Sequence, residues 1–142
     1  MLLILAGLAL TACGDDSTDP TVAGPTSSPP SQPPPQTSLV ITIDAGDGAA
    51  AQEWTLTCDP PGGTHPDPAA ACAALADIDP DVFQPVAPNQ VCTQIYGGPE
   101  TATMRGSRNG TPLNASFARN NGCEIARWDA IKPLLPAGGA TG

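Results

Sequence analysis

The stretch LTCDPPGGTHPDPAAACAAL, residues 56–75, constrains the architecture more than any other part of the chain. It begins inside an alternating segment, Glu53 to Cys58, that predicts a β-strand. A Pro- and Gly-rich loop follows from Pro60 to Pro66. The next segment, Ala69 to Ala76, is dominated by alanine, and Pro68 suits the first turn of a helix. We therefore predict a short helix there.

Further predicted strands lie on both sides of this stretch. Ser38 to Ile43 is rich in β-branched residues. Thr101 to Arg105 and Thr111 to Phe117 flank Asn109-Gly110, a dipeptide typical of tight hairpin turns. Pro112 has no N–H to donate to a ladder, so we expect an edge strand or a bulge there. Strands combined with one or two small helices predict an α+β domain.

The N-terminus has the pattern of an export signal. Leu2 to Leu10 is an apolar run that is too short to span a bilayer and fits the hydrophobic region of a signal peptide. The segment Leu10-Thr11-Ala12-Cys13-Gly14 is similar to the bacterial lipobox, in which the cysteine thiol receives diacylglycerol. We therefore predict a signal peptide over residues 1–12 and a lipid on Cys13. Two alternatives stay open: a secreted soluble protein with this spacing by chance and, because no Lys or Arg precedes the apolar run, a start codon further upstream.

Composition divides the rest of the chain into three parts. Residues 13–38 are rich in Pro, Ser and Thr and have little apolar surface to bury, so we expect the lipidated cysteine to be followed by a disordered tether. Residues 39–135 contain the predicted strands and helix and form one small domain. We expect residues 136–142 to be a disordered tail.

The chain has 5 cysteines. With Cys13 assigned to lipid, four remain in the domain: Cys58, Cys72, Cys92 and Cys123. An even set in an exported domain indicates two disulfides, and all three pairings of four cysteines are open at this point. A metal site is disfavoured, because no CxxC pair occurs and His65 is the only histidine.

The chain is acidic, with a formal net charge of −9, and all 5 of its Lys and Arg residues lie at or after Arg105. Such a surface repels phosphate, which disfavours nucleic-acid binding. An enzyme is disfavoured too, because no nucleophile–base pair or metal-ligand set is visible. We expect no cofactor.

Four segments of the domain together resemble the Streptomyces subtilisin inhibitor family. They are Leu56-Thr57-Cys58-Asp59-Pro60, Gly63-Thr64-His65-Pro66, Ala70-Ala71-Cys72-Ala73-Ala74-Leu75 and Val91-Cys92-Thr93-Gln94-Ile95-Tyr96. Single positions also match: Gly106, Gly110, Leu113 and Asn121, which stands two residues before Cys123. The similarity covers about Leu39 to Arg127.

The family resemblance implies a fold, a cysteine pairing and a location. The fold is a five-stranded antiparallel sheet with two short helices, which agrees with the α+β prediction. The implied disulfides are Cys58–Cys72 and Cys92–Cys123. The resemblance also implies a bacterial protein, actinobacterial in origin, that acts outside the cytoplasm.

The same resemblance implies a serine protease inhibitor whose partner is a subtilisin-like protease. Residues Val91 to Tyr96 match the family's reactive-site loop, with the scissile bond between Gln94 and Ile95. Asn121, or its neighbour Asn120, is expected to brace this loop by hydrogen bonds. Because family members are homodimers joined through their sheets, we expect a homodimer here as well.

Two departures from the family pattern modify this expectation. Gln94 stands where most members have Lys, Arg or Met, and it would leave the buried carboxylate of a trypsin-like pocket unpaired. We therefore expect weak or no inhibition of trypsin. Gly97-Gly98 follows Tyr96, and because two glycines loosen a backbone, we expect a flexible exit from the loop and temporary inhibition that ends in cleavage.

A second hypothesis is that the inhibitory loop has drifted. The fold would then serve as the protein-interaction module of a non-inhibitory cell-surface lipoprotein. Both hypotheses place the protein outside the cytoplasm and anchored to the cell membrane by the lipid on Cys13.

Overall fold

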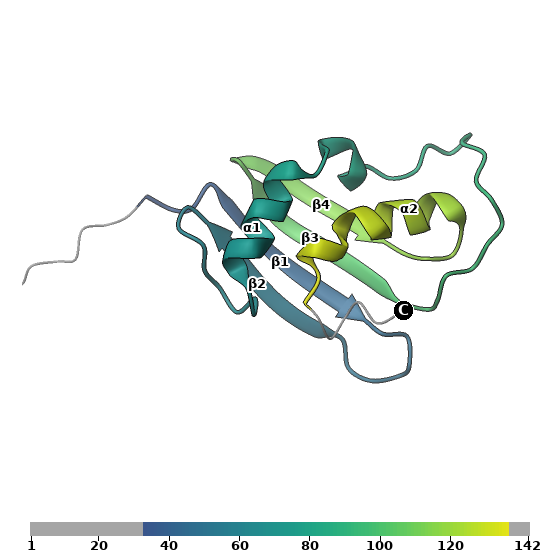
Figure 1. Ribbon diagram of the computed structural model, residues 1–142, viewed down its shortest axis with the longest axis horizontal. Coiled ribbons are helices and arrows are strands. Elements are labelled where there is room, and N and C mark those ends of the chain that lie inside the picture. Colours follow the sequence, from purple (N-terminus) through teal and green to yellow (C-terminus); the bar gives the residue numbers. More distant parts are fainter. Residues whose placement is uncertain (1–32, 137–142) are drawn as a thin grey trace, which may run out of the picture. The chain divides into compact units, whose positions relative to one another are not determined.

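The structure is a computed structural model that describes residues 33–136. Its centre is an antiparallel sheet of four strands in the order β2-β1-β3-β4. The strands are β1 (Thr37–Asp44), β2 (Gln52–Cys58), β3 (Thr101–Arg108) and β4 (Thr111–Phe117). The helices are α1 (Pro68–Asp77), η1 (Pro80–Phe83), α2 (Gly122–Ile131) and η2 (Lys132–Leu134). Figure 1 shows α1 and α2 over the same face of the sheet.

The α+β class is confirmed, but the expected count of about five strands is wrong, because the described residues form four. The segment between η1 and β3, residues 84–100, does not join the sheet. It has prolines at positions 85, 88 and 99, which lack the N–H that a ladder needs. The residues themselves indicated only four strands, and the fifth came from the family resemblance.

Alternation along β1 determines which face of the sheet is buried. Leu39, Ile41 and Ile43 point to the helices, whereas the residues between them lie on the opposite face. Ile41 pairs with Trp54 on β2 and with Met104 on β3, so the three side chains share the inner face. The fully buried large side chains of the core are Trp128, Phe117, Leu39, Ile41, Leu56, Met104, Ile131 and Leu134.

The predicted alanine-rich helix is α1. It begins where expected, because the side chain of Asp67 accepts a hydrogen bond from the Ala70 N–H at 3.0 Å. A disulfide from Cys58 to Cys72, with Cα atoms 5.8 Å apart, ties the end of β2 to this helix. At the other end of α1, Arg108 on β3 donates hydrogen bonds to main-chain carbonyls of α1 and its C-cap.

The second helix, α2, continues directly into η2 near the end of the described chain. Trp128 and Ile131 of α2 and Leu134 of η2 are buried in the core, although the family resemblance ended at about Arg127. The predicted signal peptide, the lipid on Cys13, residues 13–32 of the predicted tether and residues 137–142 of the predicted tail lie outside the described residues. Among residues 33–136, no helix is both long enough and apolar enough to cross a membrane.

Candidate functional site

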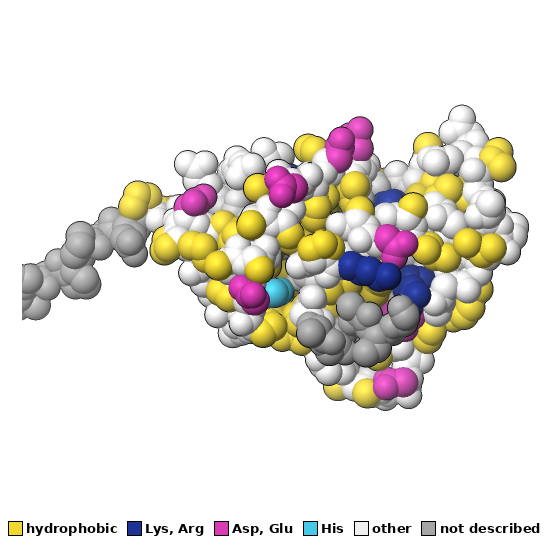
Figure 2. Space-filling view, viewed as in Figure 1, with side chains coloured by type: hydrophobic (Ala, Val, Ile, Leu, Met, Phe, Trp, Pro, Cys, Tyr) yellow, Lys and Arg dark blue, Asp and Glu magenta, His cyan; other side chains and the backbone are white. Residues whose placement is uncertain are grey.

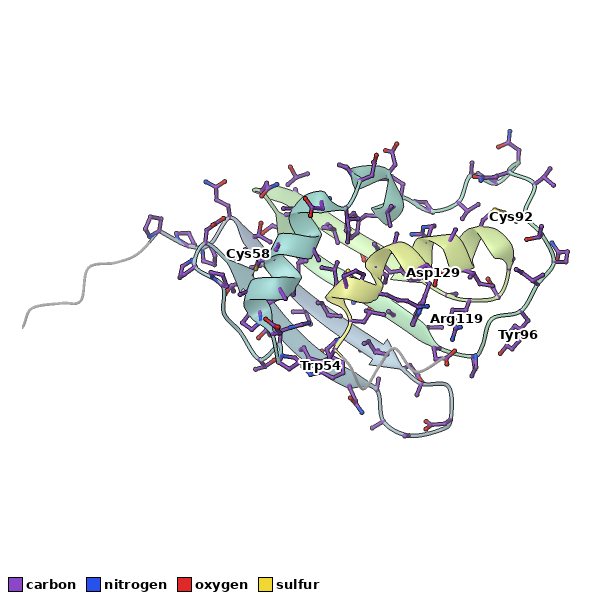
Figure 3. The ribbon with its side chains drawn as sticks, viewed as in Figure 1. Trp54, Cys58, Cys92, Tyr96, Arg119 and Asp129 are labelled. Atoms are coloured by element: carbon purple, nitrogen blue, oxygen red, sulfur yellow. A yellow bond between two sulfur atoms is a disulfide. The ribbon has the colours of Figure 1, made fainter. Side chains whose placement is uncertain are left out.

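The segment from residue 84 to residue 100 forms a long loop that reaches outward between η1 and β3 (Figure 1). Four large hydrophobic side chains are exposed in the described part of the chain, and three of them lie on this loop. Val91 is 96% exposed, Tyr96 71% and Ile95 54%. Figure 3 shows Tyr96 pointing away from the body of the domain. Because water-exposed apolar groups that cluster mark binding surfaces, this loop is the candidate site.

The N-terminal arm of the loop, residues 91–93, is held by the start of α2. Cys92 forms a disulfide with Cys123, with Cα atoms 5.4 Å apart, and this is the pairing that the family resemblance implies. The Gly122 N–H donates a hydrogen bond of 2.9 Å to the Thr93 carbonyl. N–H groups in the first turn of a helix have no partner inside the helix, so α2 offers this donor at no cost to its own structure. Covalent and hydrogen-bonded contacts therefore fix two consecutive loop residues.

The start of α2 is itself firmly placed. The side chain of Asn121 caps the helix and accepts a hydrogen bond from the Glu124 N–H at 3.0 Å. Arg127 donates from Nε to the Val82 carbonyl at 3.0 Å, and Trp128 is buried beneath the helix. A helix that is capped, bonded and packed in this way makes a rigid support for Cys123.

The side chains of the two asparagines expected to brace the loop form their hydrogen bonds elsewhere in the described residues. Asn121 bonds to Glu124 N–H, as above, and its amide Nδ2 donates to the Asn120 side chain at 3.3 Å. No side-chain hydrogen bond joins either asparagine to residues 91–96 in the part of the chain that the structure describes. Through its cap, Asn121 fixes the start of α2, to which Cys123 belongs.

The C-terminal arm of the loop, residues 97–100, is held against the segment that follows β4. The Gly97 N–H donates a hydrogen bond of 2.7 Å to the Arg119 carbonyl. The Glu100 carboxylate accepts a hydrogen bond of 3.0 Å from Arg119 Nη1, forming an ion pair. In Figure 3, Arg119 lies between α2 and the part of the loop that carries Tyr96.

This arrangement corrects the expectation that Gly97-Gly98 makes the exit of the loop flexible. A Cβ on Gly97 would lie 3.0 Å from the side chain of Ile125 on α2. Gly98 has a φ of 144°, and a Cβ there would overlap the Glu100 carboxylate. Because they lack a Cβ, the two glycines allow the loop to lie close to the body. The neighbouring side chains then restrict the movement of Gly97 and Gly98.

Between the two arms lies an exposed tip that contains the Gln94–Ile95 peptide bond. The Gln94 side chain folds back and donates a weak hydrogen bond of 3.3 Å to the Cys92 carbonyl. Behind the N-terminal arm lies an open hollow of about 600 Å³, lined by residues such as Val86 and Val91 on the loop and Ala126 on α2. The loop thus contacts the body at its two ends and stands away from it in between.

Charge is nearly absent from this loop. Residues 82–99 contain no charged side chain. The basic side chains visible in Figure 2 gather over and beside α2, next to acidic ones. Arg119 pairs with Glu100, Arg127 with Glu124 and Lys132 with Asp129. The loop therefore presents a neutral, partly apolar surface, which suits an extended binding cleft better than a charged partner.

The described residues offer little for chemistry. His65 is buried, accepts a hydrogen bond from the Asp67 N–H at Nδ1 and donates from Nε2 to the Leu134 carbonyl, so both ring nitrogens are occupied. No group of three or more potential metal-ligating side chains occurs within residues 33–136.

Sequence reasoning missed three residues of the site: Glu100, Arg119 and Gly122. Gly122 had a local signal, because Asn121 and Glu124 stand in the spacing of a helix cap and place Gly122 in the first turn. Glu100 and Arg119 are 19 positions apart and belong to no local pattern.

Comparison with known proteins gives consistent matches. The family model described as subtilisin inhibitor-like matches residues 35–121. A subtilisin inhibitor of Streptomyces violaceus is 39% identical over 95 residues, covering 62% of this chain and 64% of that protein. The trypsin inhibitor STI2 of Streptomyces longisporus is 36% identical over 127 residues, covering 83% of this chain and 86% of that protein. The chain thus spans just under two thirds of the length of the first of these relatives.

A solved structure is also similar. Streptomyces caespitosus sermetstatin, in a crystal structure with Bacillus licheniformis subtilisin, is 28% identical with a TM-score of 0.47. The match covers 69% of this chain and 96% of sermetstatin. Because the family model extends over more than half of the sequence and includes the whole loop, this chain belongs to the subtilisin inhibitor-like family.

Proposed function

We propose that this protein inhibits subtilisin-like serine proteases outside the cytoplasm, and that it is held at the membrane by a lipid on Cys13. The loop Val91 to Tyr96 would occupy the protease cleft, with the Gln94–Ile95 bond at the catalytic serine. One observation carries this proposal: an exposed, neutral segment is held at both ends and free at its tip. The Streptomyces relatives, which are named as inhibitors of subtilisin, subtilases or trypsin, support the same function.

The proposed mechanism depends on rigidity. A flexible peptide loses conformational entropy when it enters a cleft, whereas a loop that is already fixed by the Cys92–Cys123 disulfide loses little. Gln94 would enter the primary specificity pocket, and Thr93, Cys92 and Val91 would extend along the cleft on the acyl side. Release of the weak Gln94–Cys92 hydrogen bond frees the side chain for the pocket.

The neutral Gln94 side chain determines which proteases fit. A trypsin-like pocket ends in a buried carboxylate, which a glutamine would leave without a cation. A roomier pocket without this charge accepts a neutral polar side chain. We therefore propose a subtilisin-like target and expect weak or no binding to trypsin.

The deciding experiment uses the Cys13→Ser chain, which carries no lipid. Titrating subtilisin with increasing amounts of this protein should abolish proteolysis at about one inhibitor per enzyme. Rapid cleavage at Gln94–Ile95 without a stable complex would reject inhibition and favour the non-inhibitory interaction module. In that case Gln94→Ala should leave the cell-surface function unchanged.

The proposed anchor and the proposed dimer need separate tests. With Cys13 intact, the mature protein should partition into detergent and yield diacylglycerol-linked Cys13 by mass spectrometry, and Cys13→Ser should abolish both. Homodimerisation through the outer sheet face is supported by Val40, a central-strand residue that is 37% exposed on the face away from the helices. Sedimentation should show a concentration-dependent dimer that Val40→Lys disrupts, and a monomer at all concentrations would exclude it.

A further inference from the structure

We propose that Arg119 and Glu100 are positioning residues that retain the C-terminal arm of the loop after a protease cuts the Gln94–Ile95 bond. This role rests on the proposed inhibition. In this proposal, the Arg119–Glu100 ion pair keeps the newly formed amine of Ile95 close to the acyl-enzyme.

The first step of the argument is the way in which Arg119 holds the arm. Its carbonyl accepts the Gly97 N–H at 2.7 Å, and its Nη1 donates to Glu100 at 3.0 Å. Arg119 thus contacts the arm on both sides of Gly98 and Pro99. The intervening Gly98 backbone must adopt a φ of 144° beside the Glu100 carboxylate. Arg119 therefore holds the arm at Gly97 and at Glu100, on both sides of Gly98.

The second step is the burial of the pair. The side chains of Arg119 and Glu100 are only 13% and 16% exposed, whereas those of Lys132 and Asp129 in another ion pair are 39% and 54% exposed. The Arg119 guanidinium also lies 5.9 Å from the centre of the Trp128 ring. Its Nε is buried and has no hydrogen-bond partner among residues 33–136. Glu100 therefore supplies the charge that a largely desolvated cation requires, and removing either partner leaves the other uncompensated.

The third step is the asymmetry of cleavage. When the Gln94–Ile95 bond is cut, the Gln94 carbonyl becomes an ester of the enzyme serine and Ile95 becomes a free amine. The Cys92–Cys123 disulfide lies on the acyl side and does not tie Ile95 directly to α2. Between Ile95 and β3, the described hydrogen bonds that hold the amine side near the body come from Arg119, while Gly97 lies close to Ile125 on α2 and Pro99 lies close to Gly46.

Retention of the amine determines the outcome of the reaction. In religation, the Ile95 amine attacks the ester carbonyl, the Gln94–Ile95 amide re-forms, and the serine oxygen leaves with the proton lost by the amine. In hydrolysis, water takes the place of the amine, and the products are a Gln94 carboxylate and free enzyme. A positioned amine has a high effective concentration and competes with water, whereas a mobile one does not.

The first part of the test needs no protease. Backbone amide exchange in the full chain should show the Gly97 N–H protected in the unchanged protein. Arg119→Met, which keeps an unbranched apolar stem, and Glu100→Gln should accelerate this exchange at least tenfold, and Arg119→Lys should restore part of the protection. Lys132→Gln is the matched control and should leave Gly97 unchanged. Equal Gly97 exchange in all variants would overturn the proposal.

The second part measures the equilibrium ratio of cleaved to intact protein with catalytic amounts of subtilisin. Arg119→Met and Glu100→Gln should raise this ratio about tenfold while the association rate changes less than twofold, since the acyl side of the loop is untouched. If the protein without substitutions is a tight inhibitor and both variants give the same ratio of cleaved to intact protein as it does, only the positioning role is overturned. If the unchanged protein is consumed as a substrate, inhibition itself fails and the role fails with it, whatever the exchange rates show.

Discussion

The two arms of the loop are held by different kinds of bond. The N-terminal arm is joined to α2 by a disulfide, Cys92–Cys123, and by a hydrogen bond from Gly122. The C-terminal arm depends on a main-chain hydrogen bond and an ion pair, both to Arg119. The attachment of the N-terminal arm to the body is covalent, whereas the contacts of the C-terminal arm can break and re-form. The loop therefore has a permanent attachment before the Gln94–Ile95 bond and a releasable one after it.

This difference gives the two arms different energetic weights. On the chain-entropy estimate, a disulfide with the sequence separation of 31 found for Cys92 and Cys123 stabilises the fold by about 4 kcal/mol. The C-terminal arm has no covalent link to the body: its main-chain hydrogen bond contributes about 1 kcal/mol net, and its ion pair can also break and re-form. We infer that the C-terminal arm opens first under any stress that leaves the disulfides intact.

The largest expected effect comes from removing the covalent attachment. Cys92→Ser combined with Cys123→Ser should lower the free energy of unfolding by about 4 kcal/mol and turn the loop into a rapidly cut substrate. Urea denaturation measures the first effect and subtilisin titration the second. Because the N-terminal arm then keeps only the Gly122 hydrogen bond, the contrast between the arms should disappear.

The other disulfide supplies a matched control. Replacing Cys58 and Cys72 by Ser opens a closure of sequence separation 14 between β2 and α1 and should cost about 3 kcal/mol. At a temperature where this variant is still folded, it should inhibit subtilisin as the unchanged protein does. If the Cys58/Cys72 and Cys92/Cys123 variants lost inhibition equally, inhibition would depend on the global stability of the domain and not on the covalent attachment of the N-terminal arm.

The four strands and α1 could be predicted from the sequence, since their signals lie within a few residues, whereas no segment was predicted for α2. Pro112 indicated an edge strand, and β4 is an edge of the sheet. Pro68 and the alanine run predicted α1. The pairing of the cysteines could not be read from spacing and came only with the family resemblance, because loop lengths allow all three pairings.

The support of the site was harder to predict for a physical reason. The exposed segment around Gln94 was located by resemblance, but what holds its second arm depends on tertiary contacts. Gly97-Gly98 indicated flexibility by intrinsic propensity, and the approach of Arg119 and Ile125 overrides that propensity. A glycine pair has the same sequence whether it is loose or packed.

A change at the tip should alter specificity and leave both arms intact. Gln94→Lys supplies the cation that a trypsin-like pocket requires and should tighten trypsin binding by about 3 kcal/mol, more than a hundredfold in Kd. Because Gln94 is exposed, the free energy of unfolding should change by less than about 0.5 kcal/mol. Inhibition assays with trypsin measure the gain. No gain would place another residue in the specificity pocket.

A smaller effect is expected when the support of the covalent arm is weakened at a distance. Asn121→Ala removes the cap of α2 and leaves the Glu124 N–H without its acceptor, which should cost about 1 kcal/mol of stability. Asn121→Asp keeps a capping oxygen and should restore most of it. The half-life of the subtilisin complex should shorten in the alanine variant only. A shortening in the aspartate variant as well would indicate that the asparagine amide acts on the loop directly.

The smallest effect is expected for Lys132→Gln, which removes an exposed ion pair and so can be compared with the largely buried ion pair of the C-terminal arm. Lys132 and Asp129 form an ion pair of similar length, 2.9 Å, but their side chains are far more exposed than those of Arg119 and Glu100. Water and salt screen such a pair, so Lys132→Gln should change stability by less than about 0.5 kcal/mol and leave subtilisin inhibition unchanged. Raising the salt concentration should abolish even this difference, because exposed charges are screened first. If Lys132→Gln weakened inhibition as much as Arg119→Met, burial would not be what makes an ion pair near this loop effective, and the second arm would be held by the general charge of the surface.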